Sequence, residues 1–163
     1  MKKLLIIIGI IIIVGVISGN TVNNSYHNVK CSIYYADHSL MRLIPVDYDC
    51  GYSSTAGAAK KVVKKLIDGA DSNSKILRVI PAKKGCMSVT VKNSTAYVDL
   101  IQDFIQNKPE NKNLELLAIY SVVNSLTSIK GIDTVKFTVE GKDKKECIGG
   151  IDMRETLIPD YYI

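Results

Sequence analysis

The feature that most constrains this chain is an alternation of apolar and polar residues between residues 86 and 141. Residues 87–91 alternate, a polar turn follows, and residues 96–100 alternate again, which predicts a β-hairpin. An apolar helical segment then runs toward Gly131, which we expect to be its C-cap, and residues 135–139 form a further alternating strand. This order predicts an α+β domain, with a small mixed sheet of about four to five strands covered by two helices on one face.

The N-terminus has the pattern of an export signal. Lys2 and Lys3 precede an uncharged aliphatic stretch at residues 4–17. There is no cysteine beside this stretch that could direct lipoprotein processing. The stretch is about 15 residues long, between a signal-peptide core and a spanning helix of about 17–25 residues. We therefore expect residues 1–19 to be a cleaved signal peptide or a transmembrane anchor, with membrane contact through residues 4–18. Either places the rest of the chain on the extracytoplasmic side.

The remaining sequence divides into a short polar tether at residues 20–28 and a single domain at residues 29–163. Residues 29–35 alternate as a strand. Residues 40–46 form a second extended piece, which Pro45 confines to a sheet edge or a loop because proline cannot donate to a ladder. An amphipathic helix follows, capped by one of the hydroxyl residues at 53–55 and ended by Gly69.

Four lysines lie at helical spacing on that first helix: Lys60, Lys61, Lys64 and Lys65. Opposite them lies an apolar face formed by Ala56, Ala59, Val62, Val63, Leu66 and Ile67. The lysines are either a solvated face or a surface for an acidic partner, such as anionic lipid headgroups or wall polymer. The net charge is +5, of which Lys2 and Lys3 supply two, so the balance is mild and predicts no nucleic-acid partner.

The four cysteines are Cys31, Cys50, Cys86 and Cys147. There is no pair at CxxC spacing, and only two histidines could assist, so the sequence predicts no metal site. Export and an even count permit two disulfides in three connectivities. Four reduced, buried cysteines remain the other interpretation.

Two apolar features near the C-terminus allow more than one interpretation. The second helix, before Gly131, has a wider apolar arc than one face needs. It is either buried between the sheet and the C-terminal tail or exposes an edge to a partner subunit. The hydroxyl residues at 125–128 are expected to bond back to helix carbonyls. Tyr161 and Tyr162 are either a packed or half-exposed terminus or a partner contact.

The sequence contains no recognisable catalytic signature. Nucleophilic catalysis needs a base beside the nucleophile, and the two histidines fall in the tether (His27) and in a turn next to Asp37 (His38). Asp99 and Asp103 lie four residues apart, but Asp99 follows a strand and is expected to cap a turn or helix. We expect no catalytic residue and no cofactor.

A set of short pieces resembles one known family, the GerMN domain of sporulation and spore-germination proteins and of some bacterial lipoproteins. The pieces are residues 32–37 with 43–46, 66–69, 79–81, 88–91, 96–100, 120–127, 135–141, 149–152 and Leu157. Together they span about residues 29–160, and their order and spacing carry the resemblance rather than any single motif.

The resemblance implies a non-enzymatic module at a cell-envelope membrane, similar in fold to ring-building motifs. We expect a sporulation or germination protein that assembles with itself or with other envelope subunits. An alternative of another class is an envelope binding module for peptidoglycan or a small ligand. The chain departs from the family in carrying one copy where some members carry two, and in lacking a lipobox cysteine.

Overall fold

The computed structural model describes residues 30–51, 54–70, 75–80, 87–108, 110–143, 145 and 147–163. The predicted leader and tether and Cys86 lie outside these residues. The elements in chain order are β1 (Lys30–Asp37), β2 (Leu43–Asp49), α1 (Thr55–Asp68), β3 (Ile76–Leu77), β4 (Met87–Lys92), β5 (Thr95–Leu100), α2 (Gln102–Gln106), α3 (Lys112–Thr127), β6 (Thr134–Val139), β7 (Cys147–Ile148), β8 (Ile151–Asp152) and β9 (Thr156–Leu157).

The larger sheet has the order β4-β5-β6-β9. β4 and β5 form the predicted antiparallel hairpin, β6 is parallel to β5, and β9 is antiparallel to β6. Asn93 and Ser94 both have positive φ, 49° and 58°, as a two-residue type I′ hairpin turn requires. The α+β class, the mixed sheet and the hairpin are confirmed.

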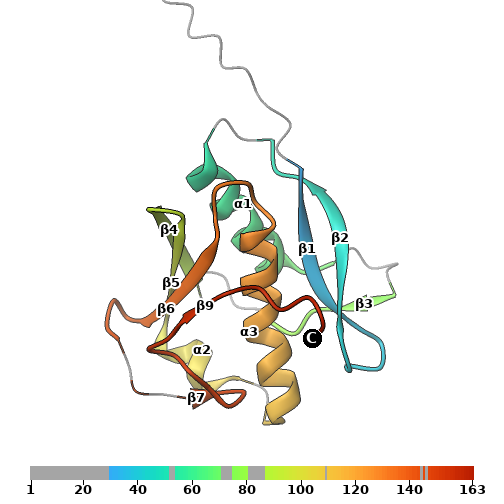
Figure 1. Cartoon of the computed structure of the whole chain (residues 1–163). Coiled ribbons are helices and arrows are strands. Elements are labelled where there is room, and N and C mark those ends of the chain that lie inside the picture. Colours follow the sequence, from blue (N-terminus) through green and yellow to red (C-terminus); the bar gives the residue numbers. More distant parts are fainter. Residues whose placement is uncertain are drawn as a thin grey trace, which may run out of the picture.

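A second sheet, β2-β1-β3, lies on the other side of α3 (Figure 1). The alternation predicted for residues 29–35 is confirmed in β1, where Cys31, Ile33 and Tyr35 are all buried. Pro45 lies on β2, which is an edge strand as expected. A disulfide joins Cys31 to Cys50 at the end of β2 and crosslinks the two strands.

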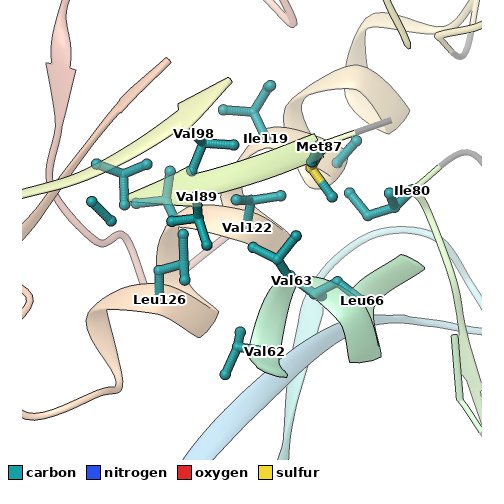
Figure 2. Packing of buried hydrophobic residues seen from close by; sticks show 14 of the residues in the cluster. Val62, Val63, Leu66, Ile80, Met87, Val89, Val98, Ile119, Val122 and Leu126 are labelled. Carbon is teal, nitrogen blue, oxygen red and sulfur yellow. The ribbon is translucent and has the colours of Figure 1, made fainter. Parts of the chain in front are cut away.

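Helix α3 runs between the two sheets, and α1 packs beside it against β4 (Figure 1). Figure 2 shows the core that results, with side chains of α1 and α3 gathered beside the sheet. The labelled residues are Val62, Val63 and Leu66 of α1, Ile119, Val122 and Leu126 of α3, and Ile80, Met87, Val89 and Val98. The wide apolar arc of α3 is thus used inside the domain.

Helix α3 ends earlier than its sequence predicts. Its last residue is Thr127 and its C-cap is Ser128, whereas Gly131, with a φ of 93°, lies in the loop to β6. The Ser128 hydroxyl donates to the Ser125 carbonyl (2.7 Å) and accepts from the Ser32 N–H (2.9 Å), so this residue is tied to β1 as well as to the helix. The prediction of Gly131 as the C-cap was wrong because this contact with β1 could not be read from the sequence.

The serines of α3 complete the edge of β1, because β3 pairs with it only at Ala36 and Asp37. The Tyr34 N–H donates to Ser125 Oγ (2.8 Å), and Ser121 Oγ donates to the Tyr34 carbonyl (2.5 Å). The Ser125 hydroxyl also bonds back to its own helix, as predicted, at the Ser121 carbonyl (2.6 Å). Helix α3 here takes the place of a neighbouring strand and supplies hydrogen-bond partners for half-buried main-chain groups of β1.

The β7–β8 hairpin is clamped to the first turns of α3. Glu115, which is buried, accepts from the Gly149 N–H (2.7 Å) and from Lys108 Nζ. Burial raises the pKa of Glu115, but the Lys108 and Gly149 hydrogen bonds outweigh it and lower the pKa below its ordinary value. Gly149 approaches the helix so closely that a Cβ there would lie 2.6 Å from the backbone nitrogen of Leu116.

Candidate interaction surfaces

The structure does not assemble the histidine and the aspartates into a site. His38 is exposed in the β1–β2 turn. Its neighbour Asp37 accepts from Ser39 Oγ (2.7 Å), the Met41 N–H (3.1 Å) and Arg42 Nε (3.3 Å). The Ser39 hydroxyl is the main cause of the lowered pKa of Asp37. Asp37 therefore organises the turn and is not seen to orient His38.

Asp99 and Asp103 have separate structural positions. Asp99 Oδ1 accepts from Thr138 Oγ1 (2.6 Å) and from the Gly141 N–H (2.7 Å), so it joins β5 to β6 and to the following loop. The N-cap of α2 is Ile101, so Asp99 does not cap that helix, but its bond to the Gly141 N–H caps the turn after β6, as the other form of the prediction expects. Asp103 lies in the first turn of α2. No group of three possible metal ligands occurs in the part of the chain that the structure describes.

Three of the lysines of α1 have different surroundings. Lys61 Nζ donates to the Asp49 carbonyl (2.9 Å) and lies 5.5 Å from the Tyr48 ring centroid, which ties α1 to β2. Lys64 forms an i,i+4 ion pair with Asp68. Lys60 is exposed. The helix begins after Ser54, whose hydroxyl accepts from the Gly57 N–H, and ends at Gly69, as predicted.

A groove of about 500 Å³ lies between α1 and β4. Its apolar lining comes from Val63 and Ile67 of α1 and from Met87 and Val89 of β4. Its polar lining is Lys60, Lys64, Asp68 and Ser88. The sequence did not predict this groove, because α1 and β4 each have the pattern of an ordinary amphipathic element. We call it the α1–β4 groove.

The C-terminal segment crosses α3 and ends beside the smaller sheet (Figure 1). Tyr161 stacks on Tyr34, with 5.7 Å between ring centroids, and the Leu43 N–H donates to the Ile163 carbonyl (3.0 Å). Tyr161 is thus the half-exposed terminus that one interpretation predicted. Large apolar side chains nevertheless remain on the surface: Met41 (72% exposed), Ile158 (67%), Tyr161 (55%) and Tyr162 (100%).

The described residues contain no helix whose length and hydropathy would let it cross a bilayer. The predicted leader lies outside them, so its role stays a prediction.

Comparison with protein families gives a match, over residues 32–145, to the family Germane, described as sporulation and spore germination. The chain belongs to the Germane family. The match covers well over half of the chain and confirms the resemblance to GerMN domains that the sequence suggested.

Solved structures show the same Germane fold. The tandem GerMN domains of the sporulation protein GerM from Bacillus subtilis match with a TM-score of 0.62 and 24% identity, covering 80% of this chain and 46% of that one. The first GerMN domain of the same protein gives 0.57 and 24%, covering 72% and 87%. A putative lipoprotein from Clostridium perfringens gives 0.57 and 15%, covering 83% and 91%.

The Germane chain therefore spans about half of the tandem GerM structure and nearly all of the lipoprotein structure. No curated protein matches its sequence.

Proposed function

We propose that this Germane domain is an exported, membrane-associated and non-enzymatic component of the sporulation or germination machinery. It acts by docking on protein partners in the cell envelope, either copies of itself or other subunits. The family match over residues 32–145 carries the proposal. The structural neighbours, a sporulation protein and a putative lipoprotein, agree with a role at the envelope.

Two features of the chain support export. Lys2 and Lys3 followed by the apolar residues 4–17 form a secretory pattern. The buried Cys31–Cys50 disulfide is of a kind that persists in oxidising compartments and is rare in the cytosol.

The polar groups of the described residues support a binding role over catalysis. Asp37, Asp99 and Glu115 each accept hydrogen bonds that hold a turn, a pair of strands or a hairpin in place. His38, the base that a hydrolase would need, is exposed in a turn. What the surface offers is apolar area, at the C-terminal tyrosines and in the α1–β4 groove.

The test is a deletion strain of the organism that encodes the protein, scored for heat-resistant spores, for germination of the spores formed and for vegetative growth. We expect a large drop in spores or in germination with normal growth. The full gene should restore the phenotype, whereas a gene lacking residues 1–28 should not. A His38→Ala gene should restore it fully.

Normal sporulation and germination in the deletion strain would contradict the proposal. Failure of His38→Ala, with wild-type protein levels, would instead favour an enzyme. Full rescue by the gene without residues 1–28 would show that export is not needed.

A further inference from the structure

Within the part of the chain that the structure describes, one main-chain edge of strand β4 is unpaired. This strand is the terminal strand of its sheet, and none of the described residues pairs with its outer side (Figure 1). Because a two-residue turn joins β4 to β5, the flanking residues Lys92 and Thr95 form a hydrogen-bonded pair, and bonded and non-bonded pairs then alternate. The N–H and C=O groups of Val89 and Val91 therefore point outward, away from β5.

The α1–β4 groove lies beside this unpaired edge. The Met87 and Val89 side chains line it from β4, and Val63 and Ile67 line it from α1. A strand added to β4 would place every second side chain on the α1 side of the sheet, because side chains alternate along a strand. Those side chains would enter an apolar groove while the main chain satisfies the edge of β4.

The charges at the groove favour one kind of occupant. Lys64 is paired with Asp68, whereas no ion pair among the described residues involves Lys60, so the rim carries an excess positive charge. If two copies paired antiparallel through β4, both α1 helices would lie on the same face and their lysines would approach one another. Like charges so placed are unfavourable, and a segment of a different protein carrying an acidic residue is favoured.

We propose that the α1–β4 groove receives an extended segment of a partner protein, which joins the sheet beside β4. Its side chains on the α1 side are apolar, and it carries an acidic residue opposite Lys60. This mode of recognition uses main-chain hydrogen bonds for affinity and alternate side-chain pockets for specificity. The inference rests on the proposed function and names how the docking is achieved.

The test begins with a displayed library of random peptides, panned on the full chain in mild detergent. We expect enrichment of sequences with an apolar residue at every second position and at least one acidic residue. The strongest binder is then synthesised, and amide hydrogen exchange of the protein is measured with and without it. Exchange should slow at Val89 and Val91 and stay unchanged at Ser88 and Thr90, which already face β5.

Three results would overturn the inference. One is that no peptide is enriched. Another is that the selected peptide protects the C-terminal tyrosine surface instead of β4. The third is that Val89 and Val91 become protected as protein concentration rises without peptide, which would assign the edge to a second copy.

Two variants, each with its own control, sharpen the test. Lys60→Glu should weaken binding of the acidic peptide by about tenfold and improve binding of a version with lysine in place of the acid. Lys130→Glu, at an exposed position after α3, is the control. Val91→Pro removes an outward N–H at an edge where proline is tolerated, and should abolish binding, whereas Val91→Thr should not. Equal binding by Lys60→Glu and wild type would contradict the charge assignment.

Complementation of the deletion strain with the Lys60→Glu gene separates this inference from the proposed function. If deletion lowers spore yield and Lys60→Glu fails to restore it, both stand. If deletion lowers spore yield and Lys60→Glu restores it fully, the docking mode is wrong while the function stands. If deletion has no effect on spores or germination, the proposed function fails whatever the peptide does.

Discussion

Asn124, buried on α3, holds the main chain of Asp160 through both of its amide atoms. Nδ2 donates to the Asp160 carbonyl (2.7 Å) and Oδ1 accepts from the Asp160 N–H (3.0 Å). One side chain of the central helix thus fixes the segment that carries the Tyr161–Tyr34 stack. An amide suits this contact, because it places a donor and an acceptor on two separate atoms of one planar group.

We expect Asn124→Asp to lower the free energy of unfolding by about 3 kcal/mol, because it removes the donor and buries a charge. Urea unfolding measures the loss, and the Tyr161 ring resonances report release of the segment. Asn113→Asp is the control: Asn113 lies on the same helix and donates to the Leu40 carbonyl (2.8 Å), but it is exposed. Equal losses in the two variants would show that the Asp160 contact does not matter.

Ser125→Ala should cost about 1–3 kcal/mol, because it leaves the Tyr34 N–H at the edge of β1 without its acceptor. Thr127→Val is a matched removal of a hydroxyl on the same helix, where the bonds go only to the Val123 and Asn124 carbonyls. We expect Thr127→Val to change stability by less than about 0.5 kcal/mol. Thermal unfolding of both variants measures the difference. Unchanged stability of Ser125→Ala would contradict the role of α3 in completing the edge of β1.

Gly149→Ala should destabilise the protein more than Gly150→Ala. Both glycines have positive φ, 63° and 86°, so an alanine at either carries about 1–2 kcal/mol of backbone strain. Only at Gly149 would the Cβ also meet the backbone of Leu116, whereas nothing lies within 4 Å at Gly150. Chemical denaturation of the pair measures the clash directly. Equal stabilities would mean that the β7–β8 hairpin does not rest tightly on α3.

The buried Glu115 predicts a specific pH dependence. Its pKa in the folded state lies below the ordinary 4.5, so its contribution to stability is present above that pH and is lost as the pH falls through the folded-state pKa. Glu115→Gln should be less stable than wild type at pH 7, and this difference should shrink below about pH 4.5. Asp37 and Asp152 also have lowered pKa values, but both proteins contain them, so their effects cancel. A difference that is independent of pH would contradict the assignment.

Reduction of the Cys31–Cys50 disulfide, whose cysteines are 19 residues apart in sequence, should cost about 3 kcal/mol from the restored freedom of the unfolded chain. Urea unfolding with and without a thiol reductant measures this. The control is the double variant Cys31→Ala/Cys50→Ala, which should be insensitive to the reductant. A further loss in the double variant would point to a second disulfide.

Much of the fold was predictable because its signals are local. The hairpin around Asn93 and the Ser54 and Gly69 caps of α1 depend on residues within a few positions of each other. The α1–β4 groove, the Asp99–Thr138 bond and the early end of α3 were not, because each depends on segments that meet only in the folded chain. A polar residue such as Ser125 or Asn124 inside an apolar helix was the available sign that the helix faces main-chain groups.

The bonds that close the edge of β1 also bear on how the chain folds. Ser32 and Tyr34 find their partners on α3 at sequence separations of 87–96 residues. Contacts between residues so far apart in sequence form only after a long loop has closed, and closing that loop costs entropy. Chains rich in such contacts fold slowly. We therefore expect folding to be limited by this closure, so that the first strands stay unpaired with α3 for longer than local hairpins take to form. A chain with that delay stays unfolded for longer, which is the state that the proposed export through a secretion channel requires.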